Sequence, residues 1–375
     1  MTKLALFYMT MQIIIFLTLI ILIYYGLHSL LFWLLIKFFF IEKFNDRLIL
    51  AIILFALSVC FILGSLIAHF DGGITAKAVY YLGSVWIGVV VNLILFLGLG
   101  FIFIKLLILF GVNVNLRIIG AILLFLTTLY TTYGIIHAQD IKIKNISVAV
   151  KNLPTAWQGK KIVQISDVHL GIINTGKLME KIVDKALAAN PDYVFITGDL
   201  LDGTGDNLSN SLASLNKIRV PIFMVTGNHE TYLGIDKTKE AINNTNIKIL
   251  HDDIVNIDGM QIIGADYPER MARKDFAPLF AKMDKAKPNI LLYHEPLYID
   301  KIKNSGIILE LCGHTHRGQM YPILFFTNLI YKGYEYGLHN FGDYNLYTTS
   351  GAGTWGPPMR IGSDSEIAII ELKNK

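Results

Sequence analysis

The sequence predicts an α-helical membrane region followed by an α/β domain, with the boundary near residue 138. Residues 1–138 contain four long apolar runs. Residues 139–375 instead alternate short strand-like segments with helix-like ones, and polar motifs rich in histidine and aspartate follow several of the strands. We therefore divide the chain into a transmembrane region of about four helices, residues 1–138, and a second domain, residues 139–375.

Each of the four apolar runs is long enough to cross a bilayer. They are Leu4–Ile41, Leu48–Phe70, Val79–Phe110 and Ile118–Ile136, and about 20 apolar residues suffice for one helical span. Buried helices of a soluble protein are the alternative, but four such runs would leave no polar faces for water. We therefore expect an integral, multi-pass membrane protein. The first run is too long for one upright span, and it lacks the cleavage site of a signal peptide.

Charge is spread unevenly between the two regions. Residues 1–138 hold seven Lys or Arg and three acidic residues, whereas residues 139–375 hold 26 of each sign. The second domain thus has no bulk attraction to nucleic acid, and no nucleic-acid partner is expected. Five basic residues flank the predicted spans on each side of the membrane, so the positive-inside rule leaves the orientation undecided. Two cysteines, Cys60 and Cys312, give no disulfide framework.

The second domain begins with an alternating strand, IKIKNISVAV, at 141–150. A helix is expected at 177–190, where apolar residues recur at helical spacing and Pro191 follows. Strands that alternate with helices imply sheets covered by helices. The further predicted strands are 161–166, 192–197, 221–226, 289–293, 306–311 and 366–372.

Five polar motifs each follow one of these predicted strands. They are ISDVHLG with Asp167 and His169, ITGDLLDG with Asp199 and Asp202, VTGNHE with Asn228 and His229, LLYHEP with His294, and LCGHTHRGQ with His314 and His316. Each motif alone is weak, because Asp-x-His, Gly-Asp and Gly-Asn occur in ordinary turns. Five of them at the strand ends, where α/β proteins place their sites, predict one shared site.

The side chains in these motifs suit a pair of divalent metal ions. Imidazole, carboxylate and amide oxygen together favour Mn, Fe or Zn, and one aspartate can bridge two ions through its two oxygens. Two aspartates and five neutral ligands would leave two divalent ions with an excess of about two positive charges. Such a centre would attract an anionic ester and would acidify a bridging water into a nucleophile.

The order D-x-H, GD-x-x-D, GNH-[DE], a lone His and GH-x-H resembles the calcineurin-like metallophosphoesterase family, from about Lys161 to Gln319. The closing GAGTWGPPMRIGSDSEIAIIEL is similar to the tail of a membrane-anchored bacterial branch with an N-terminal multi-span region. The resemblance implies an α/β domain of two β-sheets sandwiched between helices, with the site on loops at one edge. It also implies location in a bacterial cell membrane.

Carried over residue by residue, the resemblance implies seven metal ligands. Asp167, His169 and His316 would hold the first ion, Asn228, His294 and His314 the second, and Asp199 would bridge them. His229 would be catalytic, as general acid to the leaving oxygen or as a charge stabiliser. Asp202 and Glu230 are interpreted as structural. Arg317 departs from the glycine of many relatives, and solvent exposure is favoured for it over contact with a phosphate.

The predicted function is a membrane-anchored phosphohydrolase that cleaves phosphoester or pyrophosphate bonds by attack of a metal-bridging hydroxide. A lipid-linked substrate is one candidate, because the membrane region would bring an amphiphile near the site. The stretch YPILFFTNLIY at 321–331 would allow lipid contact, although a core strand or helix is the favoured interpretation.

Two other classes of function are weighed against hydrolysis. A membrane-tethered interaction domain that uses the fold without catalysis predicts missing ligands, and none is missing from the motifs. A transporter or sensor predicts ionisable groups inside the spans. His28 and His69 are the main ones, and both are expected near span ends, so simple anchoring is favoured.

Overall fold

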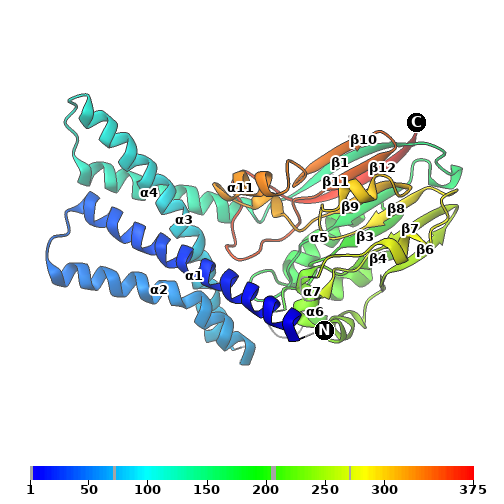
Figure 1. Cartoon of the computed structure of the whole chain (residues 1–375), viewed down its shortest axis with the longest axis horizontal. Helices are drawn as coiled ribbons and strands as arrows, with labels where there is room; N and C mark the ends of the chain where they lie inside the picture. The colour runs from blue at the N-terminus through cyan, green and yellow to red at the C-terminus, as the bar shows by residue number, and fades with distance from the viewer. Residues whose placement is uncertain (1–2, 71–72, 204–207, 270–271) are drawn as a thin grey trace. The chain divides into compact units, whose positions relative to one another are not determined.

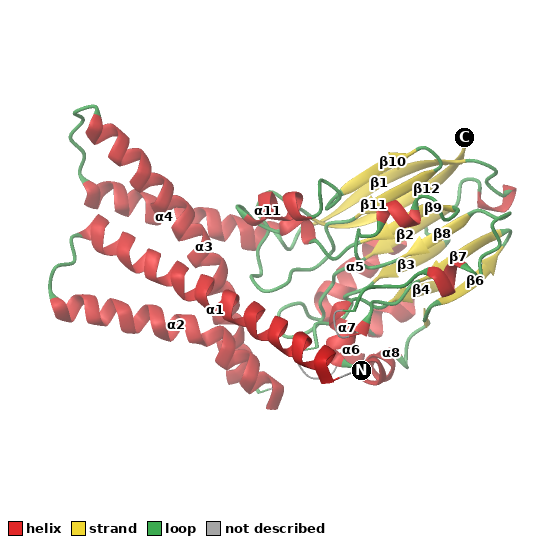
Figure 2. Cartoon of the chain, viewed as in Figure 1, coloured by secondary structure: helices red, strands yellow, loops and turns green. Residues whose placement is uncertain are grey.

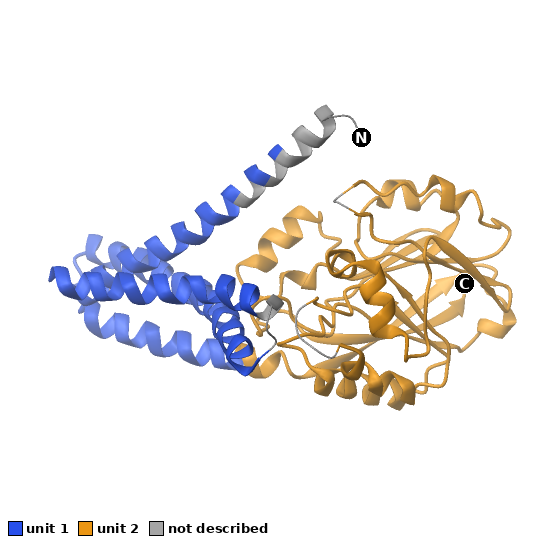
Figure 3. Cartoon of the chain, turned by 90° about the horizontal axis from the view of Figure 1, so that it is seen from below, with its two compact units in different colours: residues 1–67, 73–133 blue, residues 68–72, 134–375 orange. Residues whose placement is uncertain are grey.

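The computed structural model describes the backbone of residues 3–70, 73–203, 208–269 and 272–375. Contacts within the chain divide it into two units (Figure 3). Unit 1 comprises residues 1–67 and 73–133, and unit 2 comprises residues 68–72 and 134–375. The last turn of the fourth helix, residues 134–137, is therefore part of unit 2.

Unit 1 consists of long apolar helices, and the last residues of α2 and α4 belong to unit 2 (Figure 1). The four helices are α1 Lys3–Phe39, α2 Phe44–Phe70, α3 Ile74–Leu109 and α4 Leu116–His137. Each contains a segment long and apolar enough to cross a membrane, namely Thr18–Phe39, Phe44–Ile67, Ile74–Leu109 and Leu116–His137. Helices α1 and α3 have 37 and 36 residues. At about 1.5 Å per residue, each is longer than the roughly 30 Å hydrocarbon core of a bilayer.

Glycines bring α2 and α3 into direct backbone contact. A Cβ atom at Gly64 would lie 2.5 Å from the Tyr80 backbone, and a Cβ atom at Gly83 would lie 2.3 Å from the backbone of Phe61. Membrane helices commonly pack through small residues in this way, because lipid supplies no hydrophobic force between helices. The sequence of these two helices thus encodes a packed pair.

His28 lies in the middle of the α1 span, so the expectation that it would be near an end is wrong. The Trp86 indole N–H donates to His28 Nε2 at 3.1 Å, and His28 Nδ1 lies 2.8 Å from the Tyr24 carbonyl oxygen. Because indole can only donate, Nδ1 carries the ring proton, and both ring nitrogens are engaged. His28 therefore joins α1 to α3, which favours anchoring over ion transfer. The side chain of His69 lies outside the described residues.

Unit 2 contains two six-stranded sheets, drawn in yellow in Figure 2, and this confirms the predicted fold class. The first sheet has the order β1-β12-β2-β3-β4-β5, and the second has the order β10-β11-β9-β8-β7-β6. The strands are β1 Ile141–Val150, β2 Lys161–Ile165, β3 Tyr193–Thr197, β4 Ile222–Val225, β5 Ile247–Ile249, β6 Asp253–Ile257, β7 Met260–Gly264, β8 Asn289–Leu292, β9 Ile307–Cys312, β10 Gly337–Phe341, β11 Tyr344–Thr348 and β12 Ser365–Asn374. All seven predicted strands are present, within two residues of their predicted bounds.

Parallel pairing brings the carboxyl ends of neighbouring strands together. Strands β2 to β5 run parallel in the first sheet, as do β7, β8, β9 and β11 in the second. Parallel strands present their carboxyl ends at one edge of a sheet, which is where α/β proteins place ligands. The polar motifs after β2, β3, β4, β8 and β9 consequently reach one region.

Apolar side chains fill the space between the two sheets and the space under the helices. Residues from both sheets, among them Phe195, Ile290 and Leu309, form one buried cluster together with Trp157. The predicted helix 177–190 is α5, Gly176–Ala188, which buries four side chains from Met179 to Ala186. The other helices of unit 2 are α6 Leu208–Ser211, α7 Asn228–Leu233, α8 Ile235–Ile242, α9 Ala277–Phe280, α10 Ile299–Ile302 and α11 Ile323–Ile330.

A buried carboxyl group on β9 gives the fold a dependence on pH. Glu310 is fully buried, and burial raises its pKa from 4.5 to about 8 even though Tyr344 and Cys312 hydrogen-bond to it. The Tyr344 hydroxyl donates to Glu310, and the Cys312 sulfur lies 3.3 Å from Glu310 Oε1 and 3.5 Å from the Glu295 carbonyl. A protonated Glu310 can thus donate to the sulfur while the thiol donates onward. The folded state therefore favours the neutral acid.

We expect the stability that depends on neutral Glu310 to be present below about pH 4.5 and lost as the pH rises to about 8. Each unit of pKa difference corresponds to about 1.4 kcal/mol, so the loss amounts to a few kcal/mol. In detergent, Glu310→Gln should melt at a higher temperature than wild type at pH 9, and the difference should vanish near pH 4.5. Glu240→Gln, at an exposed position on α8, is the control. Equal melting temperatures of wild type and Glu310→Gln at pH 9 would contradict this assignment.

Candidate metal centre

The seven predicted metal ligands lie at the carboxyl ends of five strands from both sheets. Asp167 and His169 follow β2, Asp199 follows β3, Asn228 begins α7 after β4, His294 follows β8, and His314 and His316 follow β9. Their side chains are buried or nearly so, with His314 the most open at 23% exposure. The structure brings all seven together.

One group of donor atoms comes from the first and last motifs. Asp167, His169 and His316 each offer a ligand atom, and the three atoms lie within 4.8 Å of one another. The His169 and His316 Nε2 atoms are 2.9 Å apart, and His316 Nε2 lies 3.6 Å from Asp167 Oδ1. These three residues form the first cluster.

A second cluster comes from Asp199, Asn228, His294 and His314. His294 Nε2 lies 3.2 Å from Asp199 Oδ2, 3.2 Å from Asn228 Oδ1 and 3.1 Å from His314 Nδ1. Asp199 Oδ2 is also 3.7 Å from His169 Nε2 in the first cluster. Asp199 is thus the carboxylate that lies between the two clusters.

The spacing of these atoms fits metal ions. Two ligands on one ion, with bonds of about 2.1 Å, lie roughly 3.0–3.5 Å apart. The separations within the two clusters run from 2.9 to 3.6 Å. Nitrogen, carboxylate and amide oxygen form a donor set that suits first-row divalent metals. The residues present therefore fit two divalent ions.

Strained backbone accompanies the ligands. Five of the seven have positive φ angles between 48° and 71°, namely Asp167, His169, Asp199, His314 and His316. For a residue with a side chain this conformation costs on the order of 1–3 kcal/mol, and it persists where the surrounding structure imposes it. The turns after the strands thus hold the ligands in orientations that a relaxed chain would seldom adopt.

Two glycines are required for close approach to the carboxylates. A Cβ atom at Gly227 would lie 2.1 Å from Asp199 Oδ1, and one at Gly313 would lie 2.1 Å from Asp167 Oδ2. The backbone can therefore donate directly to both acids. His229 N–H donates to Asp199 Oδ1 at 2.9 Å, and His314 N–H lies 2.9 and 3.0 Å from the two oxygens of Asp167.

Hydrogen bonds from outside the clusters orient the histidines of the second cluster. His294 Nδ1 lies 2.8 Å from the carbonyl oxygen of Thr197, and His314 Nε2 lies 3.3 Å from Glu295 Oε1. Each of these ring nitrogens can donate its proton, which leaves the other nitrogen free as a ligand. Glu295 stands next to His294 in the motif LLYHEP, but no role was predicted for it from the sequence.

Arg360, whose role was likewise not predicted from the sequence, supports His316. Its guanidinium is fully buried and donates to the carbonyl oxygens of Ser350 (2.6 Å), Gly353 (2.7 Å) and His316 (3.2 Å). One of its nitrogens also lies 3.2 Å from His316 Nδ1. Arg360 thus links the tail motif GAGTWGPPMR to the ligand turn. The only sequence signal was the tail motif itself.

His229 lies beside both clusters, and with His169 and Asp199 it offers a third group of ligand atoms within 4.8 Å of one another. Its Nδ1 is 3.3 Å from Asp202 Oδ1, and its ring centre is 4.5 Å from that of His169. Two exposed aromatic rings, Tyr232 and Trp355, lie with their centres 5.6 and 6.2 Å from it. His229 therefore faces an aromatic opening of the site.

Two acidic side chains organise this part of the site. Asp202 Oδ1 lies 3.6 Å from His169 Nδ1 and also holds His229. Glu230 is fully buried and accepts hydrogen bonds from the backbone N–H groups of Asp199, Leu201 and Gly227 at 2.8–3.0 Å. These contacts agree with the structural interpretation of both residues.

The electrostatics separate the histidines into two kinds. Burial, with the charges of neighbouring histidines, lowers the pKa of His314 to about 3 and that of His316 well below its usual range. A neutral imidazole is the form that binds metal. At His294 burial opposes protonation, but the Asp199 carboxylate raises the pKa to about 10. At His229 burial likewise opposes it, while Asp202 and Asp199 raise the pKa to about 9. The field of these carboxylates attracts cations.

Arg317 does not extend into solvent, the position favoured for it from the sequence. Its guanidinium carbon lies 4.3 Å from the centre of the Tyr336 ring, a cation–π contact. The Tyr336 hydroxyl in turn donates to Glu366 at 2.9 Å. Arg317 thus packs on the Tyr336 ring, and its guanidinium is engaged there.

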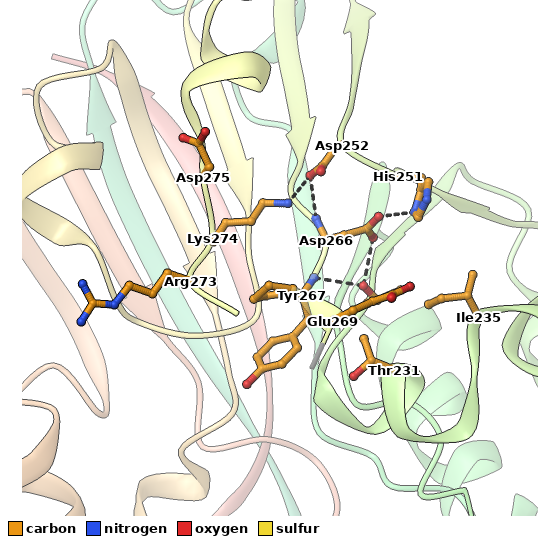
Figure 4. Close-up of a pocket in the computed structure, with 12 residues that line it drawn as sticks. Thr231, Ile235, His251, Asp252, Asp266, Tyr267, Glu269, Arg273, Lys274 and Asp275 are labelled. Carbon is orange, nitrogen blue, oxygen red and sulfur yellow. Dashed lines mark hydrogen bonds and ion pairs between the residues drawn. The ribbon is translucent and has the colours of Figure 1, made fainter. Parts of the chain in front are cut away.

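A polar pocket of about 310 Å³ lies beside the second cluster (Figure 4). Tyr267 lines it, and the ring of Tyr267 lies 6.0 Å from that of His294. Polar side chains that line the pocket contact one another (Figure 4). Lys274 pairs with Asp252, the Asp266 N–H donates to Asp252 at 3.1 Å, and His251 pairs with Asp266. The pocket therefore presents both basic and acidic side chains next to the predicted metal ligands.

Comparison with known proteins agrees with the motifs. A family model described as calcineurin-like phosphoesterase matches residues 160–318. An uncharacterized metallophosphoesterase of Campylobacter jejuni is 33% identical over 273 residues, covering 70% of this chain and 72% of that protein. A transmembrane protein with metallophosphoesterase domain from Danio rerio is 31% identical over 270 residues, covering 67% of this chain and 62% of its own length. A purple acid phosphatase from yellow lupin matches with a TM-score of 0.32 and 16% identity over 44% of this chain and 39% of that one, a likeness too distant to carry an argument.

The family match and the two clusters together indicate a dinuclear site for divalent metals. Four apolar helices and a relative named as a transmembrane protein indicate a membrane protein.

Proposed function

The chain belongs to the calcineurin-like metallophosphoesterase family, and on that premise we propose that it is a membrane-anchored, dinuclear-metal phosphohydrolase that cleaves phosphoester or pyrophosphate bonds. The observation that carries the proposal is the convergence of seven donor side chains from five strand ends, with neighbouring donor atoms 2.9–3.7 Å apart. Nothing in a scaffold or sensor domain requires that convergence.

The two clusters suggest how the ligands divide. Asp167, His169 and His316 would hold one ion, Asn228, His294 and His314 the other, and Asp199 would bridge the two. Mn, Fe and Zn all suit this donor set. When bound, two such ions supply Lewis-acid stabilisation of the phosphoryl oxygens and activate water for in-line attack.

His229 would handle the leaving group. Asp202 holds its Nδ1 at 3.3 Å, so Nε2 is free to face a substrate. A proton held at Nε2 can pass to the departing oxygen, or the imidazolium can stabilise charge that develops there. Asp202 would keep the ring in one orientation during that step.

The membrane region would anchor this site to the bilayer of a bacterial cell as four spans, with the catalytic domain beginning at about residue 139. A lipid-linked phosphoester is the substrate that this arrangement favours. Exposed Tyr232 and Trp355 beside His229 would contact apolar parts of such a molecule. The polar pocket lined by Tyr267 and Lys274 would take a polar group on the other side of the phosphate.

Metal removal tests the proposal. Purified full-length protein with Mn²⁺ should hydrolyse a chromogenic phosphodiester or phosphomonoester, because a Lewis-acid centre assists either. Dialysis against a chelator should lower the rate on the order of 10³-fold or more, since several kcal/mol of transition-state stabilisation would be lost. Added Mn²⁺ should restore the rate. Activity that survives exhaustive chelation would exclude the dinuclear mechanism.

A further inference from the structure

Helix α11, Ile323–Ile330, exposes an apolar face that the catalytic site does not use. Phe325, Phe326, Leu329 and Ile330 are 54–70% exposed, whereas Thr327 is the buried residue of the helix. The favoured expectation of a core element at 321–331 is therefore wrong. In Figure 1 the helix stands apart from the strands of both sheets.

This face is the main apolar surface in the described part of unit 2. Of its exposed large apolar side chains, most lie between Tyr321 and Ile330; the others, such as Ile143 and Leu338, are scattered. The sequence of α11, ILFFTNLI, contains no charge, and exposed Lys332 follows it. A contiguous apolar face of this kind marks a binding surface rather than ordinary surface variation.

The loop at residues 360–365 contacts both α11 and the end of α4, which is a predicted membrane span. The last turn of α4, in unit 2, packs on this loop: a Cβ atom at Gly134 would lie 2.6 Å from Ile361, and the Arg360 N–H donates to the Gly134 carbonyl at 3.0 Å. The next residue, Gly362, faces α11, where its Cβ atom would lie 2.5 Å from the Tyr321 ring and 3.1 Å from Leu324.

Further contacts fix the same arrangement. His137, the last residue of α4, lies 3.1 Å from Asp364, and the Ser365 hydroxyl donates to the Ala138 carbonyl at 2.7 Å. On the α11 side, the Ile361 N–H donates to the Gln319 carbonyl at 3.0 Å. The end of α4 and the start of α11 are thus held by neighbouring residues of a single, hydrogen-bonded loop.

We propose that α11 inserts its Phe325–Phe326–Leu329–Ile330 face into the headgroup–acyl boundary of the bilayer. The proposal rests on the membrane anchoring proposed above, because a span that ends at His137 fixes the depth of the loop and hence of α11. Interfacial helices bury a face rich in Phe, Leu and Trp at this boundary, and the exposed side chains of α11 are of these apolar kinds. The alternative is that a second copy of the chain covers this face. A contact between two copies would not require α11 to be tied to the end of a membrane span, so the loop favours the bilayer.

The insertion would bring the metal centre to the lipid surface. Only residues 317–322 separate ligand His316 from α11, and the Tyr331 ring at its other end lies 6.2 Å from the ring of His314. A phosphoester in the headgroup layer would then lie close to the ligands. Under the proposed function, this favours substrates that remain in the membrane.

Lipid contact can be measured without activity. The full chain with Cys60→Ala and Phe326→Cys is labelled with an environment-sensitive fluorophore and reconstituted into phosphatidylethanolamine–phosphatidylglycerol vesicles. Cys312 is fully buried and is not expected to react. A spin-labelled phosphatidylcholine with the label near the top of its acyl chain should at least halve the emission. Leu338→Cys on β10, with 41% exposure, is the matched control and should be quenched little.

Quenching at residue 326 no stronger than at residue 338 would overturn the proposal. So would blue-shifted emission without lipid quenching, the result expected if a second copy covered the face.

Turnover provides an independent readout. The double variant Phe325→Ser/Phe326→Ser should lower hydrolysis of a vesicle-borne phosphoester lipid several-fold and leave hydrolysis of a water-soluble chromogenic ester unchanged. The control Leu338→Ser should hydrolyse both substrates at the wild-type rate. Equal loss on both substrates would contradict the proposal. If wild type cleaved neither substrate, the proposed function would fail, while the quenching result would still decide the placement of α11.

Discussion

Asp199→Asn should remove both metal ions and abolish hydrolysis. Asp199 is the carboxylate between the clusters, with its Oδ2 atom 3.2 Å from His294 Nε2 and 3.7 Å from His169 Nε2. An asparagine keeps the shape but offers a single neutral oxygen, so it cannot balance the charge of two cations at once. We expect metal content to fall from about two ions per chain toward zero, and the rate to fall on the order of 10³-fold or more.

Two comparison variants make this result specific. Asn228→Ala removes a neutral ligand of the second cluster only, so it should weaken mainly one ion. Asp184→Asn removes a carboxylate of α5 that is 61% exposed, and it should keep both ions and full activity. Metal analysis of the detergent-purified chains distinguishes the three. Full metal content in Asp199→Asn would show that this residue does not bridge.

The strands and the grouping of the motifs could be predicted from the sequence because both are local signals. Runs such as KIVQIS and DYVFIT are apolar and short, and β2 and β3 begin within a residue of the predicted positions. Because parallel strands end at one edge of a sheet, the proximity of Asp167, Asp199 and His294 could then be predicted without knowing the order of the strands. The structure adds that both sheets of the predicted pair supply ligands.

Two hairpins escaped prediction although the chain marks both. Asp258 and Gly259 join β6 to β7, and their φ angles of +47° and +87° are those of a two-residue turn favoured between antiparallel strands. Gly342 and Asp343 join β10 to β11, and there Gly342 alone has a positive φ, +86°, which fits the other two-residue hairpin turn, with glycine first. The outer strand of each hairpin, β6 or β10, lies at an edge of the second sheet and is only partly buried, so hydrophobicity alone does not reveal the hairpins.

The residues that orient the ligands could not be predicted, because they depend on tertiary contact. Arg360 lies 44 positions after His316, and Thr197 lies 97 positions before His294. Neither residue type is unusual in its local sequence. Burial of α11 was expected because an apolar run in a soluble domain usually enters the core. The run instead faces outward, and a sequence pattern cannot distinguish an apolar face that meets protein from one that meets lipid.

His229→Ala should leave metal content unchanged and lower turnover by about 10²- to 10⁴-fold, the range for loss of a positioned proton donor. His229 offers a ligand atom within 4.8 Å of those of His169 and Asp199, but its Nδ1 lies 3.3 Å from Asp202 Oδ1, and the family pattern does not count it among the ligands. Removing it should therefore spare both ions. His339→Ala, at a histidine of β10 whose Nε2 lies 3.0 Å from the Tyr336 carbonyl, is the control and should retain full activity.

The leaving group decides which role His229 has. A general acid matters most when the departing alcohol is a poor leaving group, because a nitrophenolate needs no proton to depart. If His229 donates a proton, His229→Ala should lose far more activity on an alkyl phosphoester than on a nitrophenyl one. If it only stabilises charge on the phosphoryl oxygens, the two losses should be similar. Loss of one metal ion in His229→Ala would contradict both roles and would move His229 into the ligand set beside Asp199.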